Sequence, residues 1–304
     1  MNGGPTSVAN VHELSQRRRG VKASIYLLPN MITAASLFFG FLSMKFALDG
    51  RLPNAHPDAF LYAAYAILAA AVCDGLDGSI ARLTRTQSGF GIQLDSLCDM
   101  VSFGIVPAFV IYNYSLHTSA RLGFAACFIY ALCGALRLAR FNVQSSVGRA
   151  GGNFTGIPIP MAAMPLCAFI MSQYEFTNWT LENNYSQWAV DAALFLTRAD
   201  VKNVFLIFLM FALAFGMIST FEYISTKNIK LPRKRPFRFL SVLLMITVLM
   251  FTLEFTVTLS LLLILYCLHG PVLWLFLKRD QTAAEEELFI AGDQDDEDDE
   301  ETHT

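Results

Sequence analysis

The feature that most constrains this sequence is a series of apolar segments, each about 20 residues long, that fills most of the chain. The windows lie near residues 28–48, 60–81, 94–114, 122–141, 157–174, 203–223, 238–254 and 256–277. Each is long enough to cross the hydrocarbon core of a bilayer as a helix. Only 15% of the residues are charged, whereas a water-soluble domain carries about 25%. We therefore predict an all-α, polytopic integral membrane bundle of about eight transmembrane helices.

The charges are distributed unevenly along the chain. The formal net charge is −3, but 11 of the 25 acidic residues lie between positions 285 and 301. With eight spans, 17 of the 22 Lys and Arg residues fall on the side that holds both termini. Because cytoplasmic loops carry the excess of cations, we predict that both termini are cytoplasmic. The cations flank apolar segments and no nucleic-acid-binding motif is visible, which excludes nucleic acid as a partner.

Composition divides the chain into four parts. They are a cytoplasmic segment with a basic cluster at 1–25, a membrane core at 26–224, a basic loop with two additional C-terminal spans at 225–279, and an acidic tail at 280–304. The tail is predicted to be disordered because charges of one sign repel one another.

Two segments of the core are expected to depart from regular spanning helix. An apolar island at 188–196 predicts an amphipathic helix at the membrane interface. Glycine and alternating prolines at 155–160 predict a non-helical stretch. Irregular backbone at membrane depth needs protein or water around it, which indicates that this stretch lines a polar site. The alternative is that it is a plain loop.

Four aspartates lie at the cytoplasmic ends of the second and third predicted spans. Asp74 and Asp77 are three residues apart and Asp95 and Asp99 are four apart, so each pair lies on one face of its helix. A hairpin through the short connection at 83–92 would bring all four carboxylates together. Grouped carboxylates must hold protons or bind cations. Oxygen ligands without a suitably placed His or Cys favour Mg2+ or Mn2+, and we predict two ions.

Small and basic residues beside these aspartates indicate a phosphorylated ligand. Gly75, Gly78 and Ala81 leave room for a ligand at the helix backbone, and Arg82 can reach a phosphate. The alternatives are that the small residues serve helix packing and that the aspartates are solvated helix ends. A membrane cation transporter also uses aspartates, but typically near the bilayer midplane and in repeated halves, and no repeat is visible here.

The spacing of these residues carries a family resemblance. The stretch reads Asp74-x2-Asp77-Gly78-x2-Ala81-Arg82-x8-Gly91-x3-Asp95-x3-Asp99. It is similar, at every defined position, to the signature of the CDP-alcohol phosphotransferases. The resemblance implies that family's fold for the membrane core and an enzyme that moves a substituted phosphate from a CDP-linked donor to an alcohol, with release of CMP. It also implies metal binding by the first three aspartates, and a role for Asp99 as general base and further metal ligand.

Three other segments resemble the phosphatidylserine synthase branch of this family. They are LPNMIT at 28–33, RLARFNVQ at 137–144 and NFTGIPIPMA at 153–162. The resemblance implies CDP-diacylglycerol as donor, L-serine as acceptor, a homodimer, and a bacterial-type cytoplasmic (inner) membrane with the active site at the cytoplasmic face. Glycerol phosphate or inositol-type acceptors remain the alternatives within the family.

The candidate ligand contacts form two groups. Those assigned to CDP-diacylglycerol are Gly78, Arg82, Gly91, Asn30 and Thr33. Those assigned to serine or to a phosphate are Arg137, Arg140, Asn142 and Thr155. The two arginines are three residues apart on one helical face and present guanidinium donors to a carboxylate. Alternatively, the arginines only orient the chain and bind lipid phosphate, and Asn30 only caps the first helix.

Overall fold

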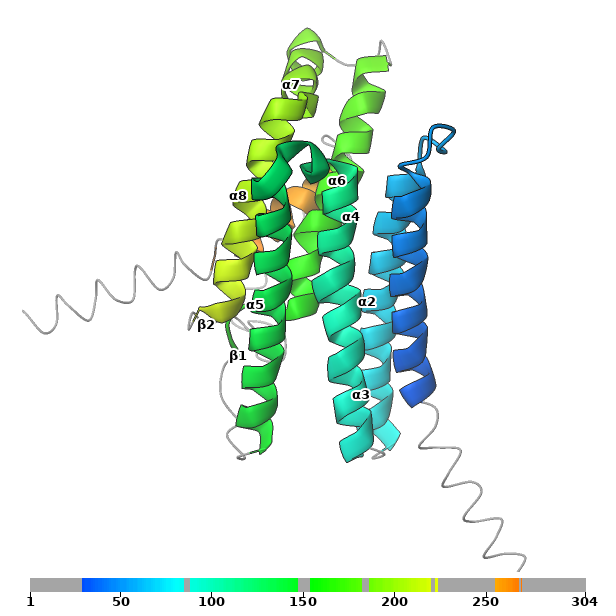
Figure 1. Ribbon diagram of the computed structural model, residues 1–304, viewed down its shortest axis with the longest axis vertical. Coiled ribbons are helices and arrows are strands. Elements are labelled where there is room, and N and C mark those ends of the chain that lie inside the picture. The colour runs from blue at the N-terminus through cyan, green and yellow to red at the C-terminus, as the bar shows by residue number, and fades with distance from the viewer. Residues whose placement is uncertain are drawn as a thin grey trace, which may run out of the picture.

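The described chain forms a bundle of long helices that run side by side along one axis (Figure 1). The computed structural model describes residues 29–84, 88–146, 154–181, 186–219, 222–223, 255–267 and 269. In chain order the elements are the Pro29–Asp49 helix, α2 (Ala59–Thr84), α3 (Gly89–Asp99), the π-helical turn η1 (Met100–Ile105), α4 (Val106–Tyr114), the 3-10 turn η2 (Leu116–Ser119), α5 (Ala120–Ser146), β1 (Phe154–Thr155), α6 (Ile159–Leu181), α7 (Gln187–Thr197), α8 (Ala199–Ile218), β2 (Glu222–Tyr223) and the Phe255–Cys267 helix.

Five helical segments within the described residues are long and apolar enough to cross a membrane. They are Pro29–Asp49, Ala59–Ala81, Gly89–Tyr114, Leu116–Gln144 and Ala199–Ile218. The predicted helical membrane architecture is thereby confirmed, while the predicted number of eight spans is not. The expected fifth span corresponds to α6, which contains Pro165 and is not one of the five. The expected seventh span at 238–254 lies outside the described residues, and the last is described only in part.

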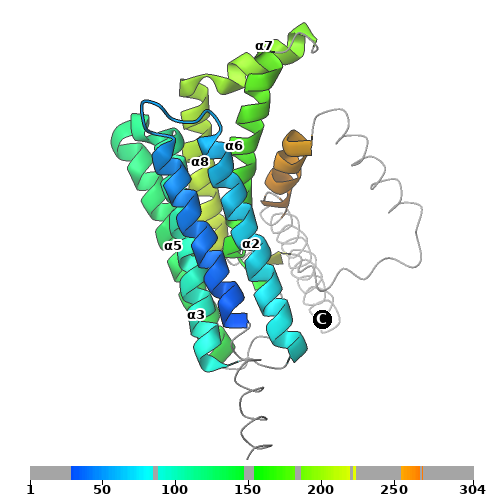
Figure 2. The same ribbon diagram turned by 90° about the vertical axis from the view of Figure 1, so that its right-hand side faces the viewer.

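Most of the predicted terminal parts also lie outside the described residues. This holds for the basic segment at 1–25, the basic loop that begins at residue 225 and the acidic tail at 280–304. The interfacial helix expected at 188–196 corresponds to α7, which lies across the end of the bundle opposite the start of α3 (Figure 2).

The prediction of a non-helical stretch at 155–160 is wrong for its last two residues. Ile159 and Pro160 form the first turn of α6, where proline is tolerated because the first N–H groups of a helix have no partner within it. The α6 helix then continues to Leu181, beyond the expected end at residue 174.

A short pair of strands, which the all-helical prediction did not include, ties the start of α6 to the end of α8. Phe154 pairs with Tyr223 and Thr155 pairs with Glu222 in an antiparallel arrangement. The next residue, Gly156, has a φ of 80°. A Cβ at that position would lie 2.5 Å from the backbone oxygen of Met217, so only glycine fits.

The core packs α5, α6 and η1 closely together. Tyr130 is fully buried, and its hydroxyl donates to the backbone oxygen of Phe103 at 3.0 Å. A Cβ added to Gly134 would lie 2.7 Å from Cδ1 of Ile159. Glycine allows this close approach, which fixes the rotation of α5 about its axis relative to the start of α6. That rotation determines the direction of the side chains at the end of α5, including Arg137 and Arg140.

Candidate metal centre and active site

The acidic site is built on a helical hairpin, as the sequence predicts. The α2 helix ends at Thr84 and α3 begins at Gly89, so a short connection joins them. Ser88 caps α3, since its Oγ accepts a hydrogen bond from the backbone N–H of Gly91 at 3.0 Å. This capped start fixes the first turn of α3 and thereby the direction of the acidic residues that follow.

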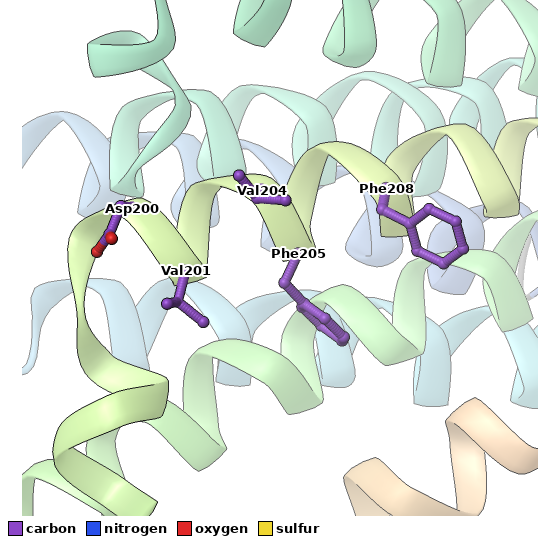
Figure 3. Close-up of a pocket in the computed structure, with 5 residues that line it drawn as sticks. All are labelled: Asp200, Val201, Val204, Phe205 and Phe208. Atoms are coloured by element: carbon purple, nitrogen blue, oxygen red, sulfur yellow. The ribbon is translucent and has the colours of Figure 1, made fainter.

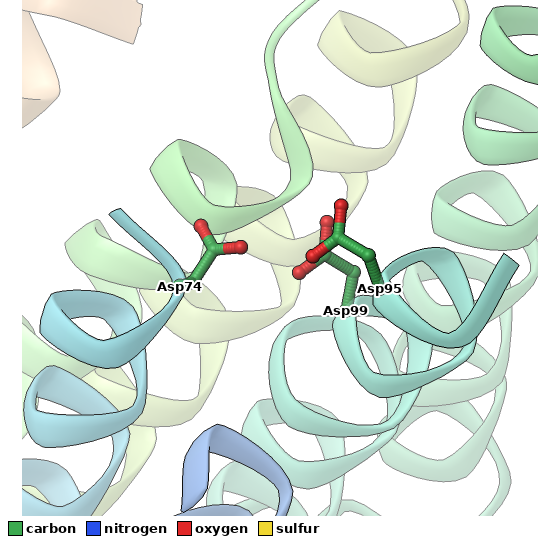
Figure 4. Close-up of side chains that lie close together, drawn as sticks. All are labelled: Asp74, Asp95 and Asp99. Carbon is green, nitrogen blue, oxygen red and sulfur yellow. The ribbon is translucent and has the colours of Figure 1, made fainter. Parts of the chain in front are cut away.

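Asp74 of α2 and Asp95 and Asp99 of α3 direct their carboxylates toward one another (Figure 4). One carboxylate oxygen from each residue lies within 4.8 Å of those of the other two. All three side chains are partly buried. Three oxygen donors so close together repel one another in the ionised state unless a cation lies between them. The donor set consists of oxygen alone, which fits a hard divalent ion.

Asp77 lies outside this group of three and faces the Pro29–Asp49 helix. The residue is buried, with 4% of its surface exposed. Its carboxylate accepts a hydrogen bond from Oγ1 of Thr33 at 2.5 Å. Three residues along an α-helix turn the side-chain direction by about 300°, which leaves Asp77 about 60° away from Asp74. The structure therefore groups three of the four predicted ligands and holds the fourth beside them through Thr33.

Two of the residues assigned to the CDP-linked donor lie against each other. A Cβ added to Gly91 would lie 3.1 Å from Oδ1 of Asn30. Asn30 lies inside the Pro29–Asp49 helix, so its carboxamide faces the first turn of α3. Gly78 and Arg82 lie on α2, and the Arg82 side chain is outside the described part of the structure. An added Cβ at Gly75 would meet no described atom within 4 Å, which leaves open space beside α2.

Arg137 of α5 is a buried cation close to the acidic group. Only 8% of its surface is exposed. Its guanidinium lies 5.5 Å from the ring centroid of Phe141 and is near enough to Asp99 for their charges to interact. No carboxylate lies within ion-pair distance of Arg137 in the described part of the chain. Within the described residues, a buried guanidinium without a carboxylate partner fits an anionic ligand.

Arg140 and Asn142 make contacts within the protein. The Arg140 guanidinium donates to the backbone oxygen of Ile218 at 2.8 Å and lies 3.4 Å from that of Ser219. It thus satisfies carbonyl groups at the C-terminal end of α8, where a cation is favourable. Nδ2 of Asn142 lies 3.1 Å from Oγ of Ser96 on α3. These bonds hold α5 against α8 and α3.

Ser96 is a site residue that sequence reasoning missed, although a signal was present. It lies three residues before Asp99, about 60° from it around α3, and it bonds with Asn142. Thr155, assigned to serine or phosphate, belongs to β1, and its side chain lies outside the described part of the structure.

Comparison with known proteins identifies the family. The sequence model of the CDP-alcohol phosphatidyltransferases matches residues 26–199. This chain belongs to that family. The resemblance read from the spacing of the aspartates is thereby confirmed, and both helices of the acidic hairpin lie within the matched region.

Several relatives of this CDP-alcohol phosphatidyltransferase carry more specific names. The CDP-diacylglycerol–serine O-phosphatidyltransferase of Helicobacter pylori is 33% identical over 257 residues, which cover 83% of this chain and 93% of the relative. A protein of the same name from Mycobacterium tuberculosis is 35% identical over 185 residues, covering 59% and 61%. The archaetidylserine synthase of Methanothermobacter thermautotrophicus is 37% identical over 153 residues, covering 50% and 60%.

Proposed function

We propose that this chain transfers the phosphatidyl group from CDP-diacylglycerol to the hydroxyl of L-serine, producing phosphatidylserine and CMP. The observation that carries this proposal is the group of carboxylates from Asp74, Asp95 and Asp99, whose oxygens lie within 4.8 Å of one another. The buried Arg137, whose charge interacts with that of Asp99, supplies a cation for the acceptor. The names of the relatives support serine as that acceptor.

The acidic group fits a divalent metal such as Mg2+ or Mn2+. Asp74, Asp95 and Asp99 would hold it, with Asp77 adjacent, and the proposal includes two ions at the site. When bound, such ions offset the charge of the diphosphate and stabilise the departing CMP. Thr33 keeps Asp77 turned toward the first helix, within the acidic region but outside the group of three.

Asp99 is proposed as the general base. A serine hydroxyl is a poor nucleophile, so a carboxylate must accept its proton while the oxygen bonds to phosphorus and the bond to CMP breaks. Asp99 is the last residue of α3 and the acidic residue that interacts with Arg137. A serine whose carboxylate is bound by Arg137 would therefore have its hydroxyl near Asp99.

Arg137 is the stronger of the two arginines as a ligand for the serine carboxylate. The Arg140 guanidinium already donates to carbonyl oxygens at the end of α8. Asn142 bonds with Ser96, so its contribution to binding is to hold α5 beside α3. Planar guanidinium donors match a carboxylate in a bidentate geometry, which gives both affinity and orientation.

We also propose that the acidic end of the bundle faces the cytoplasm, with both termini on that side. With eight spans, 17 of the 22 cationic residues fall there, among them Arg137 and Arg140. From the family resemblance we further propose that the chain forms a homodimer and lies in the inner membrane of a bacterial-type cell.

A test of the acceptor uses the full chain in detergent with CDP-diacylglycerol and Mn2+ or Mg2+. Serine, glycerol 3-phosphate and inositol are offered separately, and CMP release is measured. We expect release that depends on serine alone. Release with another alcohol would reassign the acceptor. Metal flux in proteoliposomes without CMP release from any alcohol would support the transporter alternative.

Substitution of Arg137 by lysine is expected to raise the KM for serine by about tenfold, which corresponds to about 1.4 kcal/mol. Lysine keeps the charge but loses the planar pair of donors. The KM for CDP-diacylglycerol should change little. The matched control is Arg121→Lys on α5, because Arg121 is exposed. A rise in the donor KM alone would instead assign Arg137 to a donor phosphate.

A further inference from the structure

An apolar cavity of about 300 Å³ lies between α6, the beginning of α8 and the Phe255–Cys267 helix. Its walls include Phe169 and Phe205, whose rings stack with centroids 5.3 Å apart, and Leu261 and Ile264 from the C-terminal helix. Leu196 of α7 also lines it, which places it toward the end of the bundle opposite the aspartates (Figure 2). The cavity is therefore separate from the proposed active site.

The cavity adjoins an exposed apolar surface of α8. Figure 3 shows Asp200, Val201, Val204, Phe205 and Phe208 along this helix, with Phe205 pointing toward α6. Val201 and Phe205 line both the cavity and this more open depression. Val204 and Phe208 are each 70% exposed. In a membrane this surface meets lipid tails, so a hydrocarbon chain can enter the cavity from the side.

Gln173 of α6 is a buried polar side chain at the cavity wall. Only 4% of its surface is exposed. Within the described residues its amide group makes no hydrogen bond, whereas the neighbouring Ser172 hydroxyl donates to the backbone oxygen of Phe169. Its amide is not one of the fully buried polar atoms that lack a partner in the described residues, so the amide reaches the cavity surface, where a ligand can contact it. A ligand with oxygen acceptors would supply the missing partner.

Lys202, a cationic residue, also lines the cavity. Its ammonium lies 4.8 Å from the ring centroid of Tyr114, and no described carboxylate lies within ion-pair distance. The nearby Asp200 is paired with Arg198 at 3.2 Å and does not line the cavity. Lys202 lies in the first turn of α8, where the helix dipole favours an anion. The combination of a cation, a helix start and an unbonded amide is suited to a phosphate.

We propose that this cavity binds an anionic phospholipid from the leaflet opposite the aspartates. One acyl chain occupies the apolar space, the lipid phosphate lies at Lys202, and the Gln173 amide donates to a lipid oxygen. From Pro165 to Phe176 the cavity follows α6 for about 17 Å, which accommodates much of an acyl chain.

The Phe255–Cys267 helix forms one wall of the cavity and lies outside the residues that the family model matches. The Phe255–Cys267 helix is fastened to α6 by a hydrogen bond from Ser260 Oγ to the backbone oxygen of Ala168, at 2.8 Å. The lipid site thus depends on a part of the chain that the family match, which ends at residue 199, does not include.

The test uses the full chain in phosphatidylcholine nanodiscs with a trace of phosphatidylglycerol that carries a photoactivatable acyl chain. After illumination, labelled peptides are located by mass spectrometry. We expect labels on residues 165–176 and 255–267. Lys202→Gln and, separately, Gln173→Leu should each lower this labelling by about tenfold. The matched control, Lys45→Gln, removes an exposed cation from the first helix and should leave labelling unchanged.

Three results would overturn the proposal. The first is labelling confined to other parts of the chain. The second is labelling of the cavity that both substitutions leave at the wild-type level. The third is equal labelling of the same peptides by a phosphatidylcholine with the same photoactivatable chain, since that would remove the role of the lipid charge. CMP release by the variants, measured alongside, reports separately on the proposed catalytic function.

Discussion

At saturating Mn2+, the Asp99→Asn variant is expected to retain binding of CDP-diacylglycerol, and to release CMP in the presence of serine about 100- to 10,000-fold more slowly. Asparagine has nearly the same shape and retains one oxygen toward the acidic group, but it does not accept the proton of the serine hydroxyl. Binding of the donor is measured by equilibrium dialysis and turnover by CMP release.

Asp49→Asn is the matched control for this loss. Asp49 lies at the far end of the first helix, where it is partly exposed and paired with Lys45. Its substitution should leave both measurements unchanged. A near-normal rate for Asp99→Asn would remove Asp99 from the role of base, and loss of donor binding would show that its main role is to hold the metal.

Removal of divalent metal should abolish CMP release, and Mn2+ or Mg2+ should restore it. Spectroscopic titration of Mn2+ gives a second readout that does not require turnover. We expect Asp95→Asn to weaken Mn2+ binding by more than about 100-fold. Asp77→Asn should weaken it by only about tenfold, because Asp77 lies beside the ligands and is not one of them. The difference follows from the structure, because Asp95 belongs to the group of three and Asp77 bonds to Thr33.

This prediction has clear contrary outcomes. Full turnover in a chelator, with no metal retained by the protein, would contradict a metal-dependent reaction. Equal effects of Asp77→Asn and Asp95→Asn on Mn2+ affinity would show that all four carboxylates ligate metal.

The helices and the acidic hairpin were predictable because they depend on local information. The length of an apolar window determines whether a helix can span a bilayer. The spacing of Asp95 and Asp99 places both on one helical face, and the short connection at 85–88 brings Asp74 to them. The grouping of these carboxylates therefore required no knowledge of the rest of the fold.

The partners of the remaining site residues depend on contacts between distant segments. Asp77 meets Thr33 from 44 residues earlier, and Arg140 meets carbonyl groups 78 residues later. Both contacts depend on how each helix is rotated about its axis, and for α5 the close approach of Gly134 to Ile159 sets that rotation. The pairing of β1 with β2 has the same origin, since two-residue strands carry no periodicity of their own.

The π-helical turn Met100–Ile105 directly follows Asp99. Such a turn holds more residues than the α-helical turn it replaces, and it changes the angular phase between the segments on either side of it. The acidic face of α3 is consequently out of phase with the packing face of α4, although both belong to one continuous apolar span. Inserting or deleting a residue in this turn would therefore rotate the carboxylates relative to α4, even though no acidic residue would be substituted.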